Sequence, residues 1–197
     1  MSLVSEALLF ATQHHLHQHR KGTRIPYMVH LLNVCKILAE RDCSDEILAA
    51  GLLHDVVEDT EVTIEEVDRI FGEEVGFLVR GATEADKLDK KVIEKKGSWQ
   101  ERKKHTIDFI LHEGSVEQLL VVAADKLDNL RSIYHDHGMI GGKLWSRFNA
   151  TKDQQYWYFS SIAEALKQRA DEHDIIKELA GQLEILVNNL WPDKAVN

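Results

Sequence analysis

The stretch AAGLLHDVVEDT, residues 49–60, decides how this chain is interpreted. Its first half is small and apolar, as in a helix buried against its neighbours. Its second half contains His54, Asp55, Glu58 and Asp59. If one helix continued through it, His54 and Glu58 would share a face, and so would Asp55 and Asp59. Carboxylates this close need a cation between them, so the stretch predicts a divalent metal site, the alternative being a solvated acidic helix end.

A metal needs ligands from more than one helix, and two further candidates lie elsewhere in the chain. His30 lies on a predicted helix that follows Pro26. Asp125 stands inside the apolar run LLVVAADKL, where a carboxylate is rarely left unpaired. Its simplest partner would be a nearby cation, Lys126 or Arg131. Together, two imidazoles and two carboxylates would form a mixed nitrogen and oxygen set that suits Mn²⁺, Fe²⁺ or Zn²⁺ better than Ca²⁺.

The rest of the chain is patterned for helices. Apolar residues recur at helical spacing through most of it, and few stretches alternate as strands do. Capping boxes, in which a Ser or Thr precedes a Glu or Gln by three positions, predict four helix starts. The predicted helices that follow these boxes lie near 64–71, 99–112, 116–134 and 152–168, and periodicity adds 73–83 and 174–190. The Lys-rich stretch 85–97 is interpreted as an exposed connection, and the fold class as all-α.

Length and composition limit the classes of function. At 197 residues, with 44% hydrophobic and 29% charged residues, the chain fits one ordinary folded domain. Its net charge of −9 argues against a nucleic-acid partner, which needs clustered Lys and Arg. No apolar run reaches the roughly 18–20 residues of a membrane span, and the N-terminus lacks signal-peptide features. With two cysteines and no disulfide framework, we expect a cytoplasmic protein without a membrane partner.

Five segments, in a fixed order, carry a family resemblance: RKGTRIPYMVHLL, GLLHDVVEDT, SWQERKK, AADKLDNLRSI and RFNATKDQQYWYF. A distant His, then His-Asp, then a distant Asp resembles the HD-domain metal-dependent phosphohydrolases. The whole set is similar to the small alarmone hydrolases and to the hydrolase half of RelA/SpoT-type enzymes. The resemblance implies hydrolysis of the 3′-pyrophosphate of (p)ppGpp, giving GDP or GTP and pyrophosphate. It covers roughly residues 7–166 and implies a single HD-domain helical bundle over 1–197, with a closing C-terminal helix at 174–190.

The resemblance also implies roles for individual residues. The family's metal ligands, usually of Mn²⁺, fall on His30, His54, Asp55 and Asp125. The pair that positions and deprotonates the attacking water falls on Glu58 and Asp59. Contacts to the nucleotide fall on Arg20, Lys21, Tyr27, Asn129 and Tyr156. Two positions depart from the long enzymes, because Leu31 stands where they have Pro and Asp128 where they have an aromatic residue or His.

A polyphosphorylated nucleotide over an acidic floor needs cations. At about 4 Å and an effective dielectric of about 20, each pair of unit charges is worth roughly 4 kcal/mol before desolvation. Lys103 and Lys126 are candidates for this role, beside Arg20 and Lys21. The run that contains Lys103, residues 102–104, could equally be a solvated helix face.

Several alternatives remain open from the sequence. The protein could be another HD-family nucleotide phosphohydrolase, such as a nucleotidase or a dNTP triphosphohydrolase, or it could act on an adenine alarmone. A nucleotide-binding sensor without turnover is a fourth possibility. The four histidines within residues 14–19 resemble a metal-binding tract, but they lie on different faces of a helix. We therefore interpret them as surface or packing residues, and His15 as the one that matches a family position.

Overall fold

The computed structural model describes residues 1–88 and 98–194, and throughout these ranges the regular elements are helices. The α-helices are α1 (Leu3–His14), α2 (Met28–Ala39), α3 (Asp45–Leu53), α4 (Val56–Asp59), α5 (Ile64–Phe71), α6 (Glu73–Ala82), α7 (Ala85–Leu88), α8 (Trp99–His112), α9 (Val116–Ile140), α10 (Lys152–Gln168) and α11 (Asp174–Leu190). Three short 3-10 helices are η1 (Gly141–Arg147), η2 (Ala170–Glu172) and η3 (Pro192–Lys194). The prediction of an all-α fold is confirmed.

The four predicted capping boxes are all present. Thr63, Ser98, Ser115 and Thr151 each accept a hydrogen bond from the N–H three residues on, whose Glu or Gln side chain bonds back. Each cap satisfies N–H groups that the helix itself leaves open, which is worth about 1 kcal/mol. The starts of α5, α8, α9 and α10 follow directly from these residues. Part of the predicted 85–97 connection forms α7, and the rest lies outside the described residues.

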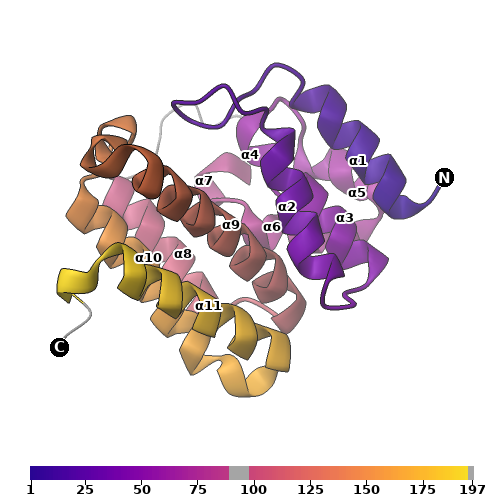
Figure 1. The fold of residues 1–197 in the computed structure, drawn as a ribbon. Coiled ribbons are helices and arrows are strands. Elements are labelled where there is room, and N and C mark those ends of the chain that lie inside the picture. Colours follow the sequence, from indigo (N-terminus) through magenta and orange to yellow (C-terminus); the bar gives the residue numbers. More distant parts are fainter. Residues whose placement is uncertain (89–97, 195–197) are drawn as a thin grey trace.

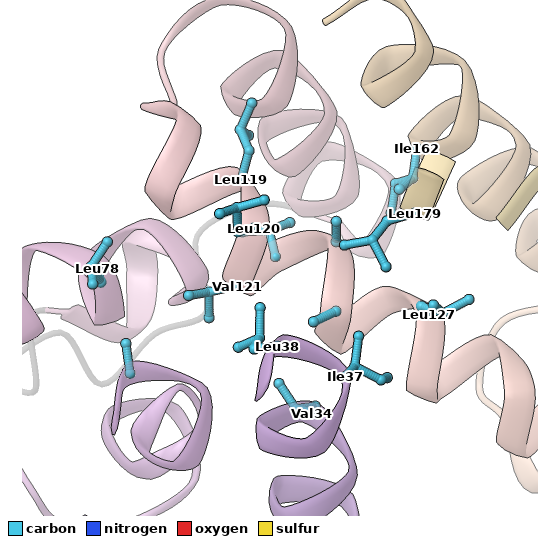
Figure 2. Close-up of a cluster of buried hydrophobic side chains, with 14 of the residues drawn as sticks. Val34, Ile37, Leu38, Leu78, Leu119, Leu120, Val121, Leu127, Ile162 and Leu179 are labelled. Carbon is cyan, nitrogen blue, oxygen red and sulfur yellow. The ribbon is translucent and has the colours of Figure 1, made fainter. Parts of the chain in front are cut away.

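Helix α9 runs through the middle of the molecule. It contacts α2, α3 and α6 on one side and α10 and α11 on the other, and Figure 1 shows it crossing between these groups. Its first half is buried from Leu119 through Asp125, which explains the apolar run in the sequence. Figure 2 shows Val121 and Leu127 of α9 among side chains from α2, α6, α10 and α11. The core therefore fixes α9 relative to the N-terminal helices, and Asp125 with it.

Two helix ends differ from the sequence-based expectation. Helix α9 extends to Ile140, beyond the predicted end at 134, and stops at Gly141, whose φ of +59° favours glycine. Its last turns are mostly polar, so apolar periodicity did not indicate that the helix continues beyond residue 134. The single continuous helix considered for residues 49–60 is not formed, because α3 ends at Leu53 and α4 begins at Val56.

The break after Leu53 has a consequence for the site. Adjacent residues in a continuous helix point about 100° apart, so His54 and Asp55 could not face the same point. In the turn between α3 and α4, Nε2 of His54 lies 2.9 Å from Oδ2 of Asp55 and 3.6 Å from Oδ1 of Asp125 on α9. Within the described residues, no helix is both long enough and apolar enough to cross a membrane.

Candidate metal centre and active site

The four predicted metal ligands converge from three parts of the chain. His30 comes from the first turn of α2, His54 and Asp55 from the bend before α4, and Asp125 from the middle of α9. The Nε2 atoms of His30 and His54 lie 3.5 and 2.9 Å from Oδ2 of Asp55. The same two atoms lie 3.2 and 3.6 Å from Oδ1 of Asp125. The structure therefore brings these four side chains, which we call the ligand cluster, to one point.

The ligand cluster fits a divalent metal ion. His54 Nδ1 lies 2.9 Å from the carbonyl oxygen of Gly51, and His30 Nδ1 lies 2.6 Å from Oδ2 of Asp128. Both rings therefore turn Nε2 toward the carboxylates. Among the described residues, neither Nε2 atom has a hydrogen-bond partner, although both side chains are about 1% exposed. Buried nitrogen atoms without partners are rare, and beside two carboxylates they form the donor set of a divalent cation.

The electrostatics of the cluster agree with this assignment. Burial would lower the pKa of His30, but the carboxylates of Asp125, Asp128 and Asp55 around its ring raise it to about 9. Burial would raise the pKa of Asp55 and Asp125, yet the nearby His54 and Lys126 hold the two values well below the usual range. Without a metal, the imidazoles thus hold protons that a cation must displace.

Glu58 and Asp59 stand beside the cluster on α4. Burial, followed by the negative charges of Asp55 and Glu84, raises the pKa of Glu58 to about 7. Burial and Asp55 also raise the pKa of Asp59, whose Oδ2 accepts a hydrogen bond of 2.7 Å from the Gln18 amide. A carboxyl group with a pKa near neutrality is suited to taking a proton from water.

Gln18 and His15 support the cluster from outside, and sequence reasoning assigned no role to Gln18. His15 is buried, and its Nδ1 is hydrogen bonded to Oε1 of Gln18, which leaves the Gln18 amide nitrogen facing Asp59. The His15 ring also stacks on Tyr27, whose hydroxyl donates a hydrogen bond of 2.6 Å to Asp55. The other three histidines of the tract are exposed. His15 therefore has the packing role expected, and it reaches two carboxylates of the site.

The predicted cations line the site, and three of the four already have a partner. Lys126 is hydrogen bonded to Asp125, as one of the two cations considered from the sequence. Lys103 forms an ion pair of 2.6 Å with Glu84, a residue the sequence did not single out. Arg20 donates a hydrogen bond of 2.9 Å to Oδ1 of Asn129.

Two cavities meet at the ligand cluster. One, of about 770 Å³, is lined by Arg20, Lys21 and His30. The other, of about 740 Å³, is lined by Asp55, Glu58, Glu84, Arg102 and Asp125. Both include Tyr27, Asp59, Lys103, Lys126 and Asn129 in their walls. The site therefore has two chambers that share these five wall residues.

Tyr156 is the predicted site residue that the structure does not bring to this place. It lines a separate cavity between α8, α10 and α11, and its hydroxyl faces the carbonyl oxygen of Lys194. Tyr158, two positions further on α10, lines the 770 Å³ cavity instead. Its hydroxyl is buried without a hydrogen-bond partner in the described part of the chain, and Lys103 Nζ lies 5.0 Å from its ring centre.

Comparison with known proteins identifies the class of this site. The family model for the HD domain matches residues 7–140, which include the whole ligand cluster. The chain therefore belongs to the HD domain family, and within it is related to the hydrolase domains of MESH1 and SpoT-type proteins.

The relatives are of two sizes. The guanosine-3′,5′-bis(diphosphate) 3′-pyrophosphohydrolase MESH1 of Drosophila melanogaster is 41% identical over 131 residues, which are 65% of this chain and 68% of that protein. The GTP pyrophosphokinase rsh of Brucella melitensis is 37% identical over 132 residues. That match covers 67% of this chain but 17% of the longer protein.

Matches to solved structures cover more of the chain than the sequence matches do. A metazoan ortholog of SpoT, which hydrolyses ppGpp and plays a role in starvation responses, superposes with a TM-score of 0.69 at 30% identity. The match covers 100% of this chain and 98% of the other. A protein from Listeria monocytogenes gives a TM-score of 0.68 at 35% identity, over 81% of this chain and 99% of its own.

Proposed function

We propose that this protein is a metal-dependent guanosine-3′,5′-bis(diphosphate) 3′-pyrophosphohydrolase that converts (p)ppGpp to GDP or GTP and pyrophosphate. The observation that carries the proposal is the ligand cluster at the junction of two chambers, with two buried Nε2 atoms that make no hydrogen bond among the described residues and face carboxylate oxygens. The relationship to MESH1, a hydrolase of this name, supports the substrate. We propose Mn²⁺ as the metal because it is the usual metal of the family that the sequence resembles, and the mixed nitrogen and oxygen set can hold it.

In the proposed reaction, the metal ion and the side chains of the protein have different roles. A divalent cation at such a site acidifies a water molecule and polarises a phosphoryl oxygen. Glu58 takes the proton from the attacking water, because its pKa of about 7 keeps it near half-ionised at neutral pH. Asp59 orients that water, and the Gln18 amide holds Asp59 in place. Tyr27 donates to Asp55 and so fixes the carboxylate that faces both histidines.

The two chambers suit the two parts of the substrate. The nucleoside enters the cavity lined by Arg20 and Lys21, with Asn129 at the sugar. The 3′-pyrophosphate extends toward the second cavity, where Lys103, Lys126 and Arg102 meet its negative charge. Since these cations are paired with carboxylates, phosphate oxygens replace Glu84 on Lys103 as the substrate binds.

We propose one domain over residues 1–197, with its core near 7–166, and a small-molecule nucleotide as the substrate, with no nucleic-acid or membrane partner. A cytoplasmic location fits the two free thiols, Cys35 and Cys43, which are typical of a reducing compartment.

A substrate panel tests this function. Protein stripped of metal with a chelator and reloaded with Mn²⁺ is given ppGpp, pppGpp, the adenosine counterpart of ppGpp, GTP and dGTP. We expect pyrophosphate from ppGpp and pppGpp and none without metal. Turnover of dGTP with ppGpp left intact would instead make it a different HD-family nucleotide phosphohydrolase, and turnover of the adenosine compound alone would change the base.

A further inference from the structure

Asp128 is a buried carboxylate to which the proposed mechanism gives no task. It lies on α9, three positions after Asp125, and is 4% exposed. Its Oδ2 atom lies 2.6 Å from Nδ1 of His30, and its Oδ1 atom accepts a hydrogen bond of 3.0 Å from Nδ2 of Asn33. Both oxygens are therefore in use, and both partners come from α2.

These contacts determine the tautomer and the orientation of the His30 ring. An aspartate carboxylate offers only acceptors, so Nδ1 of His30 must carry the hydrogen. Nε2 then directs its lone pair at the point between Asp55 and Asp125, once its proton is displaced. His54 is held differently, because its Nδ1 faces the backbone carbonyl of Gly51. One imidazole of the cluster is thus oriented by a negative charge and the other by a neutral dipole.

The placement follows from the packing of α2 on α9. Residues three apart share a helix face, so Asp125 and Asp128 both point at α2. His30 and Asn33 are also three apart, and both point back at α9. Helix α9 therefore supplies one metal ligand directly and holds a second one through Asp128.

We propose that Asp128 is a positioning residue that fixes the ring of His30 and strengthens its bond to the metal. This rests on the metal site of the proposed function but not on its substrate. Carboxylates behind a metal-binding histidine raise the basicity of the ring, and their loss typically weakens metal affinity about 10–100-fold. We expect a loss of that size for Mn²⁺ when Asp128 is replaced by Ala.

The experiment is a Mn²⁺ titration of chelator-stripped protein, with free Mn²⁺ quantified by its electron paramagnetic resonance signal. Asp128→Ala is compared with wild type and with Asp136→Asn, which removes a carboxylate from the same helix that is paired with Arg147 instead. Asp136→Asn should bind Mn²⁺ as wild type does. Affinity within twofold of wild type for Asp128→Ala would overturn the proposal.

A reciprocal exchange separates positioning from a general structural role. Asp128→Asn alone cannot accept from both His30 and Asn33, because an amide has one oxygen. Combined with Asn33→Asp, the new amide can accept from His30 and donate to the carboxylate at position 33. We expect Asp128→Asn to lose affinity and the double variant to recover part of it. A double variant that binds Mn²⁺ no better than the single one, although its thermal unfolding matches wild type, would contradict the proposal.

A spectroscopic readout follows the ring itself. In protein loaded with the diamagnetic ion Zn²⁺, ¹⁵N spectra of labelled histidine should show His30 with hydrogen on Nδ1 and metal on Nε2. In Asp128→Ala this signature should broaden or change while that of His54 stays. If wild-type protein binds metal as expected but leaves ppGpp intact, the proposed activity fails while the role of Asp128 stands.

Discussion

The ligand cluster and the cations beside it are held in contrasting ways. His30 and Asp125 come from α2 and α9, and His54 and Asp55 from the turn between α3 and α4. Among the described residues, Nε2 of His30 and Nε2 of His54 make no hydrogen bond and face carboxylate oxygens instead. The cations, by contrast, lie on long side chains that are already paired, as Lys103 is with Glu84. The ligand cluster can therefore bind a metal ion without breaking a hydrogen bond of either Nε2 atom. The paired cations must instead exchange a protein carboxylate for a phosphate of the substrate. Metal binding should depend on geometry, and substrate binding on the cost of that exchange.

The largest expected effect is on the cluster. Asp125→Ala removes a carboxylate that faces both histidines and leaves Lys126 without its partner. Because metal catalysis contributes several kcal/mol, ppGpp hydrolysis should fall by about 10³-fold or more. Initial rates at saturating Mn²⁺ measure this, with Asp108→Ala, on the far more exposed α8, as control. Activity within tenfold of wild type would mean that Asp125 is not part of the catalytic metal site.

The stability of the metal-free protein should depend on pH, because Glu58 is buried beside other carboxylates. The pKa of Glu58 in the folded state, about 7, lies above the ordinary value of 4.5. Between these values the folded state binds more protons than the unfolded one, so stability falls as pH rises. The loss at Glu58 amounts to about 3 kcal/mol, and Glu58→Gln should remove it. Urea unfolding at pH 4.5 and 7.5 measures the change in the free energy of unfolding, with Glu61→Gln as the control. An equal change between the two pH values in wild type and in Glu58→Gln would refute this prediction.

Glu58→Gln should also separate catalysis from metal binding. The amide keeps the size of the side chain but cannot accept a proton from water. We expect kcat to fall by about 10²-fold or more while Mn²⁺ affinity stays within a few-fold of wild type. Single-turnover rates and a Mn²⁺ titration provide the two readouts. A matching loss in both would place Glu58 among the metal ligands instead.

A smaller effect is expected at the cations. Lys103→Ala removes one charge-assisted bond to the substrate, worth about 1.5–3 kcal/mol, and also removes the cost of separating Lys103 from Glu84. Since these changes partly offset, kcat/KM for ppGpp should fall by roughly tenfold, and less at high salt. Lys104→Ala, on the exposed neighbouring position, is the matched control. Equal effects of the two substitutions would show that the 102–104 run is a solvated face.

The smallest effect distinguishes two tyrosines. Tyr158→Phe removes the buried hydroxyl of a residue that lines the nucleoside chamber, and a neutral hydrogen bond there would be worth about 0.5–1.5 kcal/mol. KM for ppGpp should rise about 2–10-fold, whereas Tyr156→Phe should leave it unchanged. The reverse order in steady-state kinetics would support the role that the sequence predicted for Tyr156.

The sequence predicted most of the fold because capping residues act locally. Thr63, Ser98, Ser115 and Thr151 begin helices whatever packs on them later, and α5, α8, α9 and α10 start where they indicate. The break after Leu53 was not predicted, because it serves contacts with α9 that lie far away in the sequence. Periodicity alone would have continued the helix.

In the candidate site, too, some residues could be predicted from the sequence and others could not. Burying His and Asp side chains in apolar surroundings is costly unless a ligand or a counter-charge meets them, so the cluster was predictable. Gln18, Glu84 and Asp128 were missed as partners, because such side chains serve many purposes and packing alone selects their contacts. The two tyrosines of α10 stand about 200° apart on the helix, and a run of aromatic residues does not show which one faces the chamber.

The most direct test is hydrolysis of ppGpp by Mn²⁺-reloaded protein in H₂¹⁸O, with both products analysed by mass spectrometry. A water activated at the ligand cluster should attack the phosphorus next to the ribose. We predict one ¹⁸O atom in the released pyrophosphate, unlabelled GDP, and no product from Asp125→Ala. Release of orthophosphate, label in the nucleoside, or intact ppGpp despite bound Mn²⁺ would contradict the proposed function.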